Sequence, residues 1–335
     1  MDIFNRFLKN ELLTTKYFLL SSMKIMITGG LGFVGSHLCD ELLKDDHEII
    51  LLSKNDNKKE NILHNLNKIK LEYVDVTNFS DLEKTIEENT PEVIFHLAGE
   101  TSHKKSFENP LYDVDANSKS TLCILEKIKN LNLKCRFILG STFIVIGKPD
   151  KLPINEETPS NPTTIYGANR LASENYCKIY HNVYNLDTII FRITNSFGPR
   201  EQYLTPVKNA INFLIYKAFK GEDVTIYNQG KFFRDVIYIS DVISGLKTMM
   251  LYGKPGNLYW ISSGNKTWFY EIAKWLEELT NAKIKYVDPP IYTQKVDVGN
   301  FLVNNSKLKS LGWDVKTSVK KGIEMTLDYF NSHKL

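Results

Sequence analysis

The sequence predicts an α/β fold, in which a doubly wound parallel sheet is followed by a smaller C-terminal lobe. Strand-like and helix-like segments alternate through the first two-thirds of the 335 residues. The strand-like runs are continuously rich in Ile, Val, Leu and Phe, which is typical of parallel strands covered on both faces. A glycine-rich turn follows the first of these runs. Together the three observations favour a parallel sheet with helices on both sides.

The expected strands of the sheet are short apolar runs at 23–28, 48–52, 69–74, 92–97, 134–140 and 187–193. The longest helical patterns between them lie at 111–130 and 162–185. Beyond Gly198-Pro199 the pattern becomes irregular. There we expect helices near 206–220, 240–251, 267–280 and 316–331, and short strands near 224–227, 258–261 and 284–287.

The turn after the first strand carries chemistry. Gly29, Gly32 and Gly35 are three residues apart, and apolar positions recur at helical spacing from Phe33. A dinucleotide pyrophosphate needs such a turn, because the backbone must take positive φ, side chains must be absent where phosphate approaches, and a helix N-terminus must offer free N–H groups. The placement between strand and helix predicts nucleotide binding.

These features divide the chain into three parts. Residues 1–22 are an N-terminal extension, either a loose surface helix or the product of an upstream start codon. Residues 23–198 form a Rossmann-like dinucleotide-binding domain, to which later segments contribute. Residues 199–335 form a lobe over the carboxyl edge of the sheet, where ligands of open α/β sheets bind.

Composition excludes several classes of protein. The sequence is 42% hydrophobic and 24% charged with a net charge of +3, and it has no basic stripe, so we expect no nucleic-acid partner. The four cysteines are far apart and include no C-x-x-C pair, so neither a metal site nor a disulfide framework is expected. Reduced thiols fit a cytoplasmic protein. No apolar run reaches about 18 residues, so we expect no membrane span.

The helical pattern at 162–185 holds a candidate catalytic pair. Tyr166 and Arg170 are four residues apart and therefore lie on one helical face. A tyrosine acts as a base near neutral pH only when a nearby positive charge lowers its pKa of about 10. In an arbitrary helix the pair would be an ordinary surface contact. Behind the fifth strand of a nucleotide-binding sheet, it indicates acid–base chemistry.

The end of the fifth strand supplies hydroxyl groups. Ser141 and Thr142 point to opposite sides of an extended chain, so only one of them can face the ligand crevice and bind a carbonyl or alcohol oxygen. The alternative is that both hydroxyls bond only the local backbone.

At this point the chain resembles the extended short-chain dehydrogenase/reductases, and within them the nucleotide-sugar epimerase/dehydratase branch. The resemblance covers residues 23–332. The matching motifs, in order, are Thr28 to Gly35, His96-Leu-Ala-Gly99, Asn117, Ser141-Thr142 with Gly147 after it, Tyr166-x-x-x-Arg170, Arg192 to Pro199, and Arg234-Asp235.

The resemblance implies roles for individual residues. Tyr166 would be the acid/base, Thr142 its hydroxyl partner and Arg170 the positive charge. Asn117 would hold a kinked helix and its water, and Asp75-Val76 would meet the adenine. The implied cofactor-binding residues are Gly29, Gly32, Phe33, Val34, Gly35, Ser53, Lys54, Asp75, Val76, Leu97, Ala98, Gly99, Asn117, Tyr166 and Arg170.

The implied substrate-binding residues are Thr142, Asn195, Leu204, Ile226 and Arg234, and in this family they grip a nucleotide diphosphate. Arg234 has a physical reason of its own, since a guanidinium group suits phosphate oxygens. A salt bridge to Asp235 or Asp241 is the alternative.

The chain departs from the family pattern at three places. Arg170 stands where the family usually has lysine; it keeps the charge but is bulkier and forked. The second strand ends in Ser53-Lys54 instead of the acidic residue that binds the ribose of NAD, so NAD is expected and NADP is not excluded. Phe143 and Ile144 replace the Asp-Glu pair of 4,6-dehydratases, and neither can transfer a proton.

The function that this pattern predicts is NAD(P)-dependent epimerisation of a nucleotide sugar through transient oxidation at C4, as in polysaccharide biosynthesis. A net 4-dehydrogenase or 4-ketoreductase would use the same residues, and a non-catalytic dinucleotide-sensing protein is a further alternative. The base and the sugar are not encoded in any motif. The resemblance also implies a homodimer built from the helices at 111–130 and 162–185, in which Leu122, Leu125, Tyr176 and Tyr180 supply apolar positions.

Overall fold

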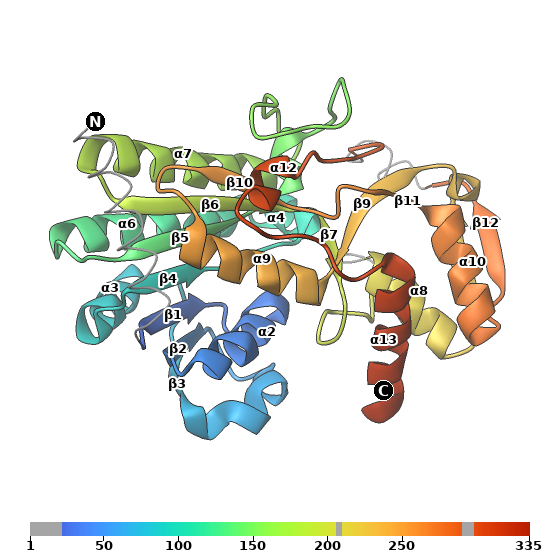
Figure 1. The fold of residues 1–335 in the computed structure, drawn as a ribbon, viewed down its shortest axis with the longest axis horizontal. Coiled ribbons are helices and arrows are strands. Elements are labelled where there is room, and N and C mark those ends of the chain that lie inside the picture. The colour runs from blue at the N-terminus through green and yellow to red at the C-terminus, as the bar shows by residue number, and fades with distance from the viewer. Residues whose placement is uncertain (1–21, 206–209, 290–297) are drawn as a thin grey trace.

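The computed structural model describes residues 22–205, 210–289 and 298–335. Nearly all of the expected N-terminal extension lies outside these ranges. Figure 1 shows a broad sheet flanked by helices, with a smaller group of helices and short strands beside it. The α/β class and the Rossmann-like sheet that the sequence predicts are confirmed.

The main sheet has seven strands, all parallel, in the order β10-β6-β5-β4-β1-β2-β3. Their bounds are β1 Lys24–Thr28, β2 Glu48–Ser53, β3 Ile69–Tyr73, β4 Val93–His96, β5 Arg136–Thr142, β6 Asp187–Ile193 and β10 Leu258–Ile261. The order of strands reverses between β1 and β4. Ligands of such sheets bind at that reversal, beyond the carboxyl ends of the strands.

Both faces of the sheet are buried at its centre because β1, β2 and β4 are largely apolar, whereas the edge strand β3 is only partly covered. In β1, Ile25 and Ile27 pack into one core with α2 (Phe33–Leu42) and α9 (Ile239–Tyr252). Met26, between them, packs into the opposite core with α3 (Phe79–Asn89), α6 (Ser120–Asn130) and α7 (Ile165–Tyr184). Successive side chains of a strand point to opposite faces, so a continuous apolar run fills two layers at once.

The smaller lobe contains two short sheets. One has the order β11-β9-β7, from Lys266–Trp268, Phe233–Tyr238 and Asn195–Phe197, and the other pairs β12 (Ile284–Val287) with β8 (Val224–Tyr227). Its helices are α8 Ala210–Phe219, α10 Phe269–Thr280, α12 Ser306–Lys309 and α13 Val319–Ser332. The four helices and three strands expected after Gly198-Pro199 are present within a few residues, except that 206–209 lie outside the described residues. Strands β7, β9 and β11 and the short helix α12 were not expected.

Segments after residue 198 also contribute to the main sheet. The strand at 258–261 does not belong to the smaller lobe: as β10 it extends the main sheet beside β6, with Trp260 opposite Arg192. The helix before it, α9, also lies on the main sheet and packs against α2. The reason is chemical, because all four residues of β10 are buried and apolar and need cover on both faces.

The helix expected at 111–130 is broken into pieces. It consists of α5 (Pro110–Val114), a π-helical turn η3 (Asp115–Lys119) and α6, and α4 (His103–Glu108) precedes it. Asn117 lies in the π turn, which confirms the kink. Two of the side chains expected at a dimer face are instead inside the protomer, since Leu125 is fully buried and Tyr180 is 7% exposed. Both side chains pack with residues of α3 and α6 in the core of the protomer, so they are not available to a partner subunit.

None of the helices in the described residues combines the length and apolar character needed to cross a bilayer. In the same ranges, no three His, Cys, Asp or Glu side chains are grouped so that they could hold a metal ion.

Candidate active site

The glycine turn has the shape that the sequence predicts. Gly29 adopts φ of +70°, and its carbonyl accepts the Gly32 N–H at 2.9 Å, which closes the turn before α2. A Cβ on Gly35 would lie 2.5 Å from the Gly29 oxygen, so a side chain there would force the helix away from the turn. Phe33 is buried and Val34 half-buried in the first turn of α2. The turn therefore leaves backbone, and no side chain, facing the place where a pyrophosphate would lie.

A buried histidine joins this turn to the end of β4. His96 bonds Thr28 Oγ1 at 2.8 Å and Ser120 Oγ at 3.2 Å, and the Ala98 N–H donates to Thr28 Oγ1 at 3.1 Å. Burial lowers the pKa of His96 to about 3, so the imidazole stays neutral. These bonds fix the segment Leu97 to Gly99 beside Gly29.

Gly99, Asn117 and Arg170 form a cradle with unused hydrogen-bonding atoms. A Cβ on Gly99 would collide with Asn117 Oδ1 and Arg170 Nη2. Asn117 donates to Glu100 O at 3.0 Å, and Arg170 Nη2 donates to Ala98 O at 3.2 Å. Among the described residues, Asn117 Oδ1 and Arg170 Nε and Nη1 are buried without a hydrogen-bond partner. One acceptor and two donors left unpaired are costly unless a ligand completes them. A ligand rich in hydroxyl and amide groups, such as a nicotinamide riboside, fits this donor set.

Tyr166 lies in the first turn of α7, which Thr164 caps by accepting the Gly167 N–H at 3.0 Å. The helix begins close to the end of β5, because a Cβ on Gly167 would lie 3.2 Å from Ile144 O. The Arg170 guanidinium lies 5.9 Å from the Tyr166 ring centroid, and both side chains are buried. The structure thus brings together the tyrosine and the positive charge that the sequence pairs by spacing.

The two hydroxyls at the end of β5 have separate roles. Ser141 Oγ donates to the buried carboxylate of Glu174 at 2.6 Å. Thr142 Oγ1 instead accepts the Ile144 N–H at a long 3.3 Å, which leaves its own proton free to be donated. Of the two, Thr142 is therefore the one available to a ligand.

His103 lies near the site, although no pattern in the sequence singles it out. Its ring centroid lies 5.7 Å from that of Tyr166, at the start of α4. Burial lowers the pKa of His103, against the opposing charge of Asp113. No motif surrounds His103, and only the fold brings α4 against α7.

The residues expected at the adenosine end are bound to each other. Lys54 Nζ forms an ion pair with Asp75 Oδ2 at 2.8 Å and also donates to the Tyr112 hydroxyl at 3.3 Å. The hydrogen bond to Asp75 raises the pKa of Lys54. Ser53 Oγ donates to Asn55 O at 2.8 Å, and Val76 is buried. Because Asp75 neutralises Lys54, the lysine offers a 2′-phosphate less charge than the sequence alone implies.

Four of the five expected substrate residues come from different segments of the smaller lobe, and the fifth, Thr142, ends β5 of the main sheet. Asn195 begins β7, and in the described structure its buried Oδ1 is without a hydrogen-bond partner. Arg234 on β9 is 9% exposed, and its guanidinium lies 5.4 Å from the Phe232 ring centroid. Leu204 is 65% exposed, whereas Ile226 is 1% exposed in the core, so only the backbone of Ile226 could meet a ligand.

The alternative partners of Arg234 are held elsewhere. Asp235 accepts hydrogen bonds from the backbone of Ser263, Gly264 and Val303. Asp241 accepts the N–H groups of Lys316 and Thr317 at 3.0 Å. Both carboxylates organise loops of the smaller lobe.

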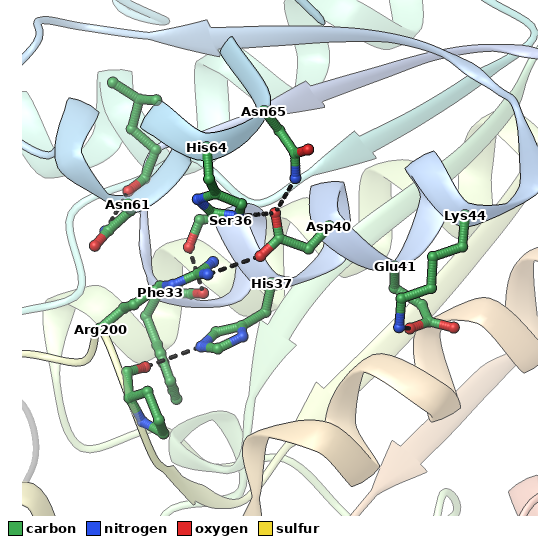
Figure 2. A network of polar contacts seen from close by, with 12 residues as sticks. Phe33, Ser36, His37, Asp40, Glu41, Lys44, Asn61, His64, Asn65 and Arg200 are labelled. Atoms are coloured by element: carbon green, nitrogen blue, oxygen red, sulfur yellow. Dashed lines mark hydrogen bonds and ion pairs between the residues drawn. The ribbon is translucent and has the colours of Figure 1, made fainter. Parts of the chain in front are cut away.

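A polar network ties helix α2 to the smaller lobe. Figure 2 shows Asp40 of α2 between His64, Asn65 and Arg200. His37, one helical turn earlier, points toward the loop that contains Arg200. Asp40 accepts from His64 and Asn65 at 2.9 Å each, and His37 Nε2 donates to Pro199 O at 2.9 Å. Arg200 lies in the loop that follows β7, close in sequence to Leu204. No local pattern in the sequence indicates this network, because its members are up to 162 residues apart.

The chain is similar to known proteins over most of its length. Residues 25–262 match the model of the NAD dependent epimerase/dehydratase family. The chain is 28% identical to a UDP-glucose 4-epimerase of Mycolicibacterium smegmatis, over 92% of this chain and 99% of that one. It is 29% identical to UDP-glucuronic acid decarboxylase 1 of Xenopus tropicalis, over 92% of this chain and 72% of that one.

Among solved structures, the fold matches a UDP-glucose 4-epimerase of Thermotoga maritima determined with UDP-glucose. The TM-score is 0.85 and the identity 27%, over 93% of this chain and all of that one. Relatives with different reactions are thus about equally similar in sequence, so similarity alone does not choose between reactions.

Proposed function

Because this chain belongs to the NAD-dependent epimerase/dehydratase family, we propose that it is a nucleotide-sugar epimerase that acts by transient oxidation at C4 of the sugar. The observation that carries the proposal is the arrangement of Tyr166 and Arg170 on one buried face of α7, next to the end of β5 where Thr142 lies. An acid/base, a positive charge and a hydroxyl donor are the groups that reversible alcohol oxidation requires.

NAD is the cofactor that the proposal assigns. The Gly29–Gly35 turn would hold its pyrophosphate, and Asn117 and Arg170 would bind the nicotinamide riboside with the atoms that are otherwise unpaired. When bound, the nicotinamide supplies a reversible hydride acceptor. The neutralised Lys54 removes one reason to expect NADP.

The protein's own residues manage the proton and the oxygen. Tyr166 takes the proton of the C4 hydroxyl, and Arg170 supplies the positive charge beside it. Thr142 donates a hydrogen bond to O4 as that oxygen becomes a carbonyl. Tyr166 then returns the proton to O4 on whichever face the sugar presents. A sugar that has not turned gives back substrate, and one that has turned gives the C4 epimer.

The proposed reaction does not include elimination of water from the sugar. Phe143 lies 5.0 Å from Phe301, ring centroid to ring centroid, and Ile144 is 6% exposed. Both positions after Thr142 are therefore apolar and packed, so neither supplies the acid and base of a 4,6-dehydratase. A 4-keto-6-deoxy product formed from a nucleotide hexose would contradict the proposal.

The test is turnover with a panel of nucleotide hexoses and NAD, followed by NMR of the sugar and by absorbance of NADH. Interconversion of C4 epimers without net NADH supports epimerisation. Net NADH or its consumption would indicate a 4-dehydrogenase or 4-ketoreductase instead, and cofactor binding without any turnover would indicate a sensing protein. UDP-glucuronic acid belongs in the panel, because one relative is named for its decarboxylation.

We also propose a cellular location and an oligomeric state for the protein. We assign it a cytoplasmic location, because Cys39, Cys135 and Cys177 are buried free thiols. We also assign it a homodimer through α6 and α7. On α7, Ile179 is 51% and Val183 is 65% exposed.

A further inference from the structure

A buried ion pair lies behind the candidate catalytic residues, and the proposed reaction gives it no role. Glu174 on α7 is fully buried and Arg192 on β6 is 2% exposed. Arg192 Nε donates to Glu174 Oε1 at 2.8 Å and Nη2 donates to Oε2 at 2.7 Å. Two parallel bonds between a guanidinium and a carboxylate fix both the distance and the orientation of the two side chains.

The ion pair joins the elements that carry the catalytic residues. Ser141, which directly precedes Thr142, donates to Glu174 Oε1 at 2.6 Å, and Ser141 lies opposite Arg192 in the β5–β6 register. Arg192 Nη2 also donates to Ser160 Oγ at 2.9 Å, in the segment that leads into α7. The end of β5, the end of β6 and the approach to α7 thus meet at one carboxylate–guanidinium pair.

The pair also continues the catalytic face of α7. Tyr166, Arg170 and Glu174 follow one another at intervals of four residues, so the three side chains lie along one side of the helix. Tyr166 and Arg170 face the candidate site, and Glu174 reaches the strand that ends in Thr142. A shift of α7 along β5 would therefore strain the bond between Glu174 and Ser141.

Stability alone does not account for a pair buried this deeply. Removing two charges from water is costly, and replacing a buried ion pair with apolar side chains of similar size often leaves stability unchanged or raised. Such a replacement does, however, lose the fixed orientation. Misplacing a reacting group by about 1 Å can cost about 100-fold in rate.

We propose that Glu174 and Arg192 are positioning residues, which hold Thr142 at its working distance from Tyr166 by locking the end of β5 to α7. The proposal rests on the proposed function, since it concerns the same two catalytic groups. It adds to that function a second layer of residues, none of which touches substrate or cofactor.

The test replaces the pair with apolar side chains in the double variant Glu174→Leu/Arg192→Met. We expect its unfolding midpoint to equal or exceed that of the wild type, while kcat falls about tenfold or more. KM and the dissociation constant of NAD should stay within about twofold. A crystal structure should show Thr142 displaced relative to Tyr166, which is a readout independent of turnover.

The chain offers a matched control. Arg136 and Asp187 begin the same two strands, are opposite each other in register and form an ion pair of 2.9 Å at the far edge of the sheet. The variant Arg136→Met/Asp187→Leu should change the unfolding midpoint and leave kcat within about twofold. A merely structural role of Glu174 and Arg192 would make the two double variants behave alike.

Several outcomes would overturn the proposal. A stable Glu174→Leu/Arg192→Met variant with wild-type kcat would do so, as would an unmoved Thr142. If that variant does not fold, Ser141→Ala removes only the link between the strand and the ion pair; kcat should then fall about threefold or more, and an unchanged kcat would overturn the proposal. Wild-type protein that turns over no nucleotide sugar would refute the proposed function instead, and the position of Thr142 in the variant crystal would still decide the positioning role.

Discussion

Asp40 and Arg200 form an ion pair of 2.7 Å that links the nucleotide-binding helix α2 to the loop after β7. Arg200 holds a left-handed backbone conformation with φ of +67°, which costs a non-glycine residue energy unless its surroundings maintain it. The side chains of Arg200 and Asp40 are 16% and 23% exposed, so the pair is partly shielded from water. The position of this loop therefore depends on the helix that would bind the cofactor.

Breaking this pair should weaken sugar binding more than cofactor binding. In Arg200→Gln we expect KM for the nucleotide sugar to rise by up to about fivefold, which corresponds to about 1 kcal/mol for a partly exposed ion pair. The dissociation constant of NAD should change less than twofold. Lys44→Gln is the control, because it removes another ion pair of α2, with Glu41, that does not reach the smaller lobe. Equal effects of the two variants would show that the loop does not contribute to sugar binding.

Tyr166→Phe should remove the proton acceptor and keep the packing of the ring. Loss of a general acid/base lowers turnover by about 10² or more. Binding of NAD, measured by calorimetry, should be nearly unchanged. Tyr252→Phe, on the exposed end of α9, is the control for removing a tyrosine hydroxyl. Full activity of the Tyr166 variant would end the role assigned to this residue.

Cofactor preference should respond to the partner of Lys54. Asp75→Asn leaves Lys54 with an uncompensated charge, so we expect the affinity for NADP to rise relative to NAD by up to about fivefold, within the range of exposed ion pairs. The gain should shrink as salt is added, because an exposed charge is screened. Ser53→Asp should act in the opposite direction, since a carboxylate repels a 2′-phosphate. Titrations in which neither substitution changes the ratio would place residues 53–54 and 75 away from the ribose.

Stability should fall as the pH is lowered from 7 to 5. Burial lowers the pKa of His96 to about 3 and that of His37 to about 4, whereas an unfolded chain titrates its histidines near about 6.5. Below about pH 6.5 the unfolded state therefore binds protons at these histidines and the folded state does not. The free energy of unfolding that is present above that pH is lost as the pH falls. For fully buried His96 the loss is about 2 kcal/mol at pH 5.

His37 allows the pH effect to be tested by substitution. In His37→Gln an amide can still donate to Pro199 O but does not titrate, so the urea midpoint should depend less on pH between 7 and 5. His333→Gln, at an exposed position near the C-terminus, should leave the slope unchanged. A wild-type midpoint that rises on acidification would contradict the neutral, buried state of these rings.

The proposed dimer can be disrupted at α7. Ile179 and Val183 are one helical turn apart and exposed, so Ile179→Lys/Val183→Lys should give a monomer by sedimentation at micromolar concentration. Met325→Lys, on the exposed side of α13, should leave the association unchanged. Wild-type protein that sediments as a monomer would remove this part of the proposal.

The sequence predicts the main sheet well because its signals are local. Each strand up to β6 is a largely apolar run, and Gly29, Gly32 and Gly35 mark the turn that starts α2. The start of α5 has a local sign as well, since Asn109-Pro110 can cap and begin a helix. A kink at Asn117 was expected only from the resemblance, and its form as a π turn was not expected.

The other features depend on contacts between distant parts of the chain. Strand β9 reads as a mixed run, Phe233 to Tyr238, whose buried Arg234 and Asp235 are acceptable only because other elements bond them. In the sequence, Glu174 looks like a surface residue of an amphipathic helix. Only the fold brings Arg192 of β6 into contact with it. The pairing of Lys54 with Asp75 likewise follows from β2 and β3 lying side by side. Asp235, Glu174 and Lys54 thus bond groups that are distant in sequence.

The place of β10 also has a consequence for synthesis of the protein on the ribosome. Strand β6 has β5 on one side only until residues 258–261 have been made, so a nascent chain ending near residue 198 exposes one open edge of apolar, fully extended backbone. Such an edge is a template for pairing with other chains. We therefore expect a truncated chain that stops at 198 to aggregate, and one that continues through β10 to be the shortest N-terminal fragment that stays dispersed.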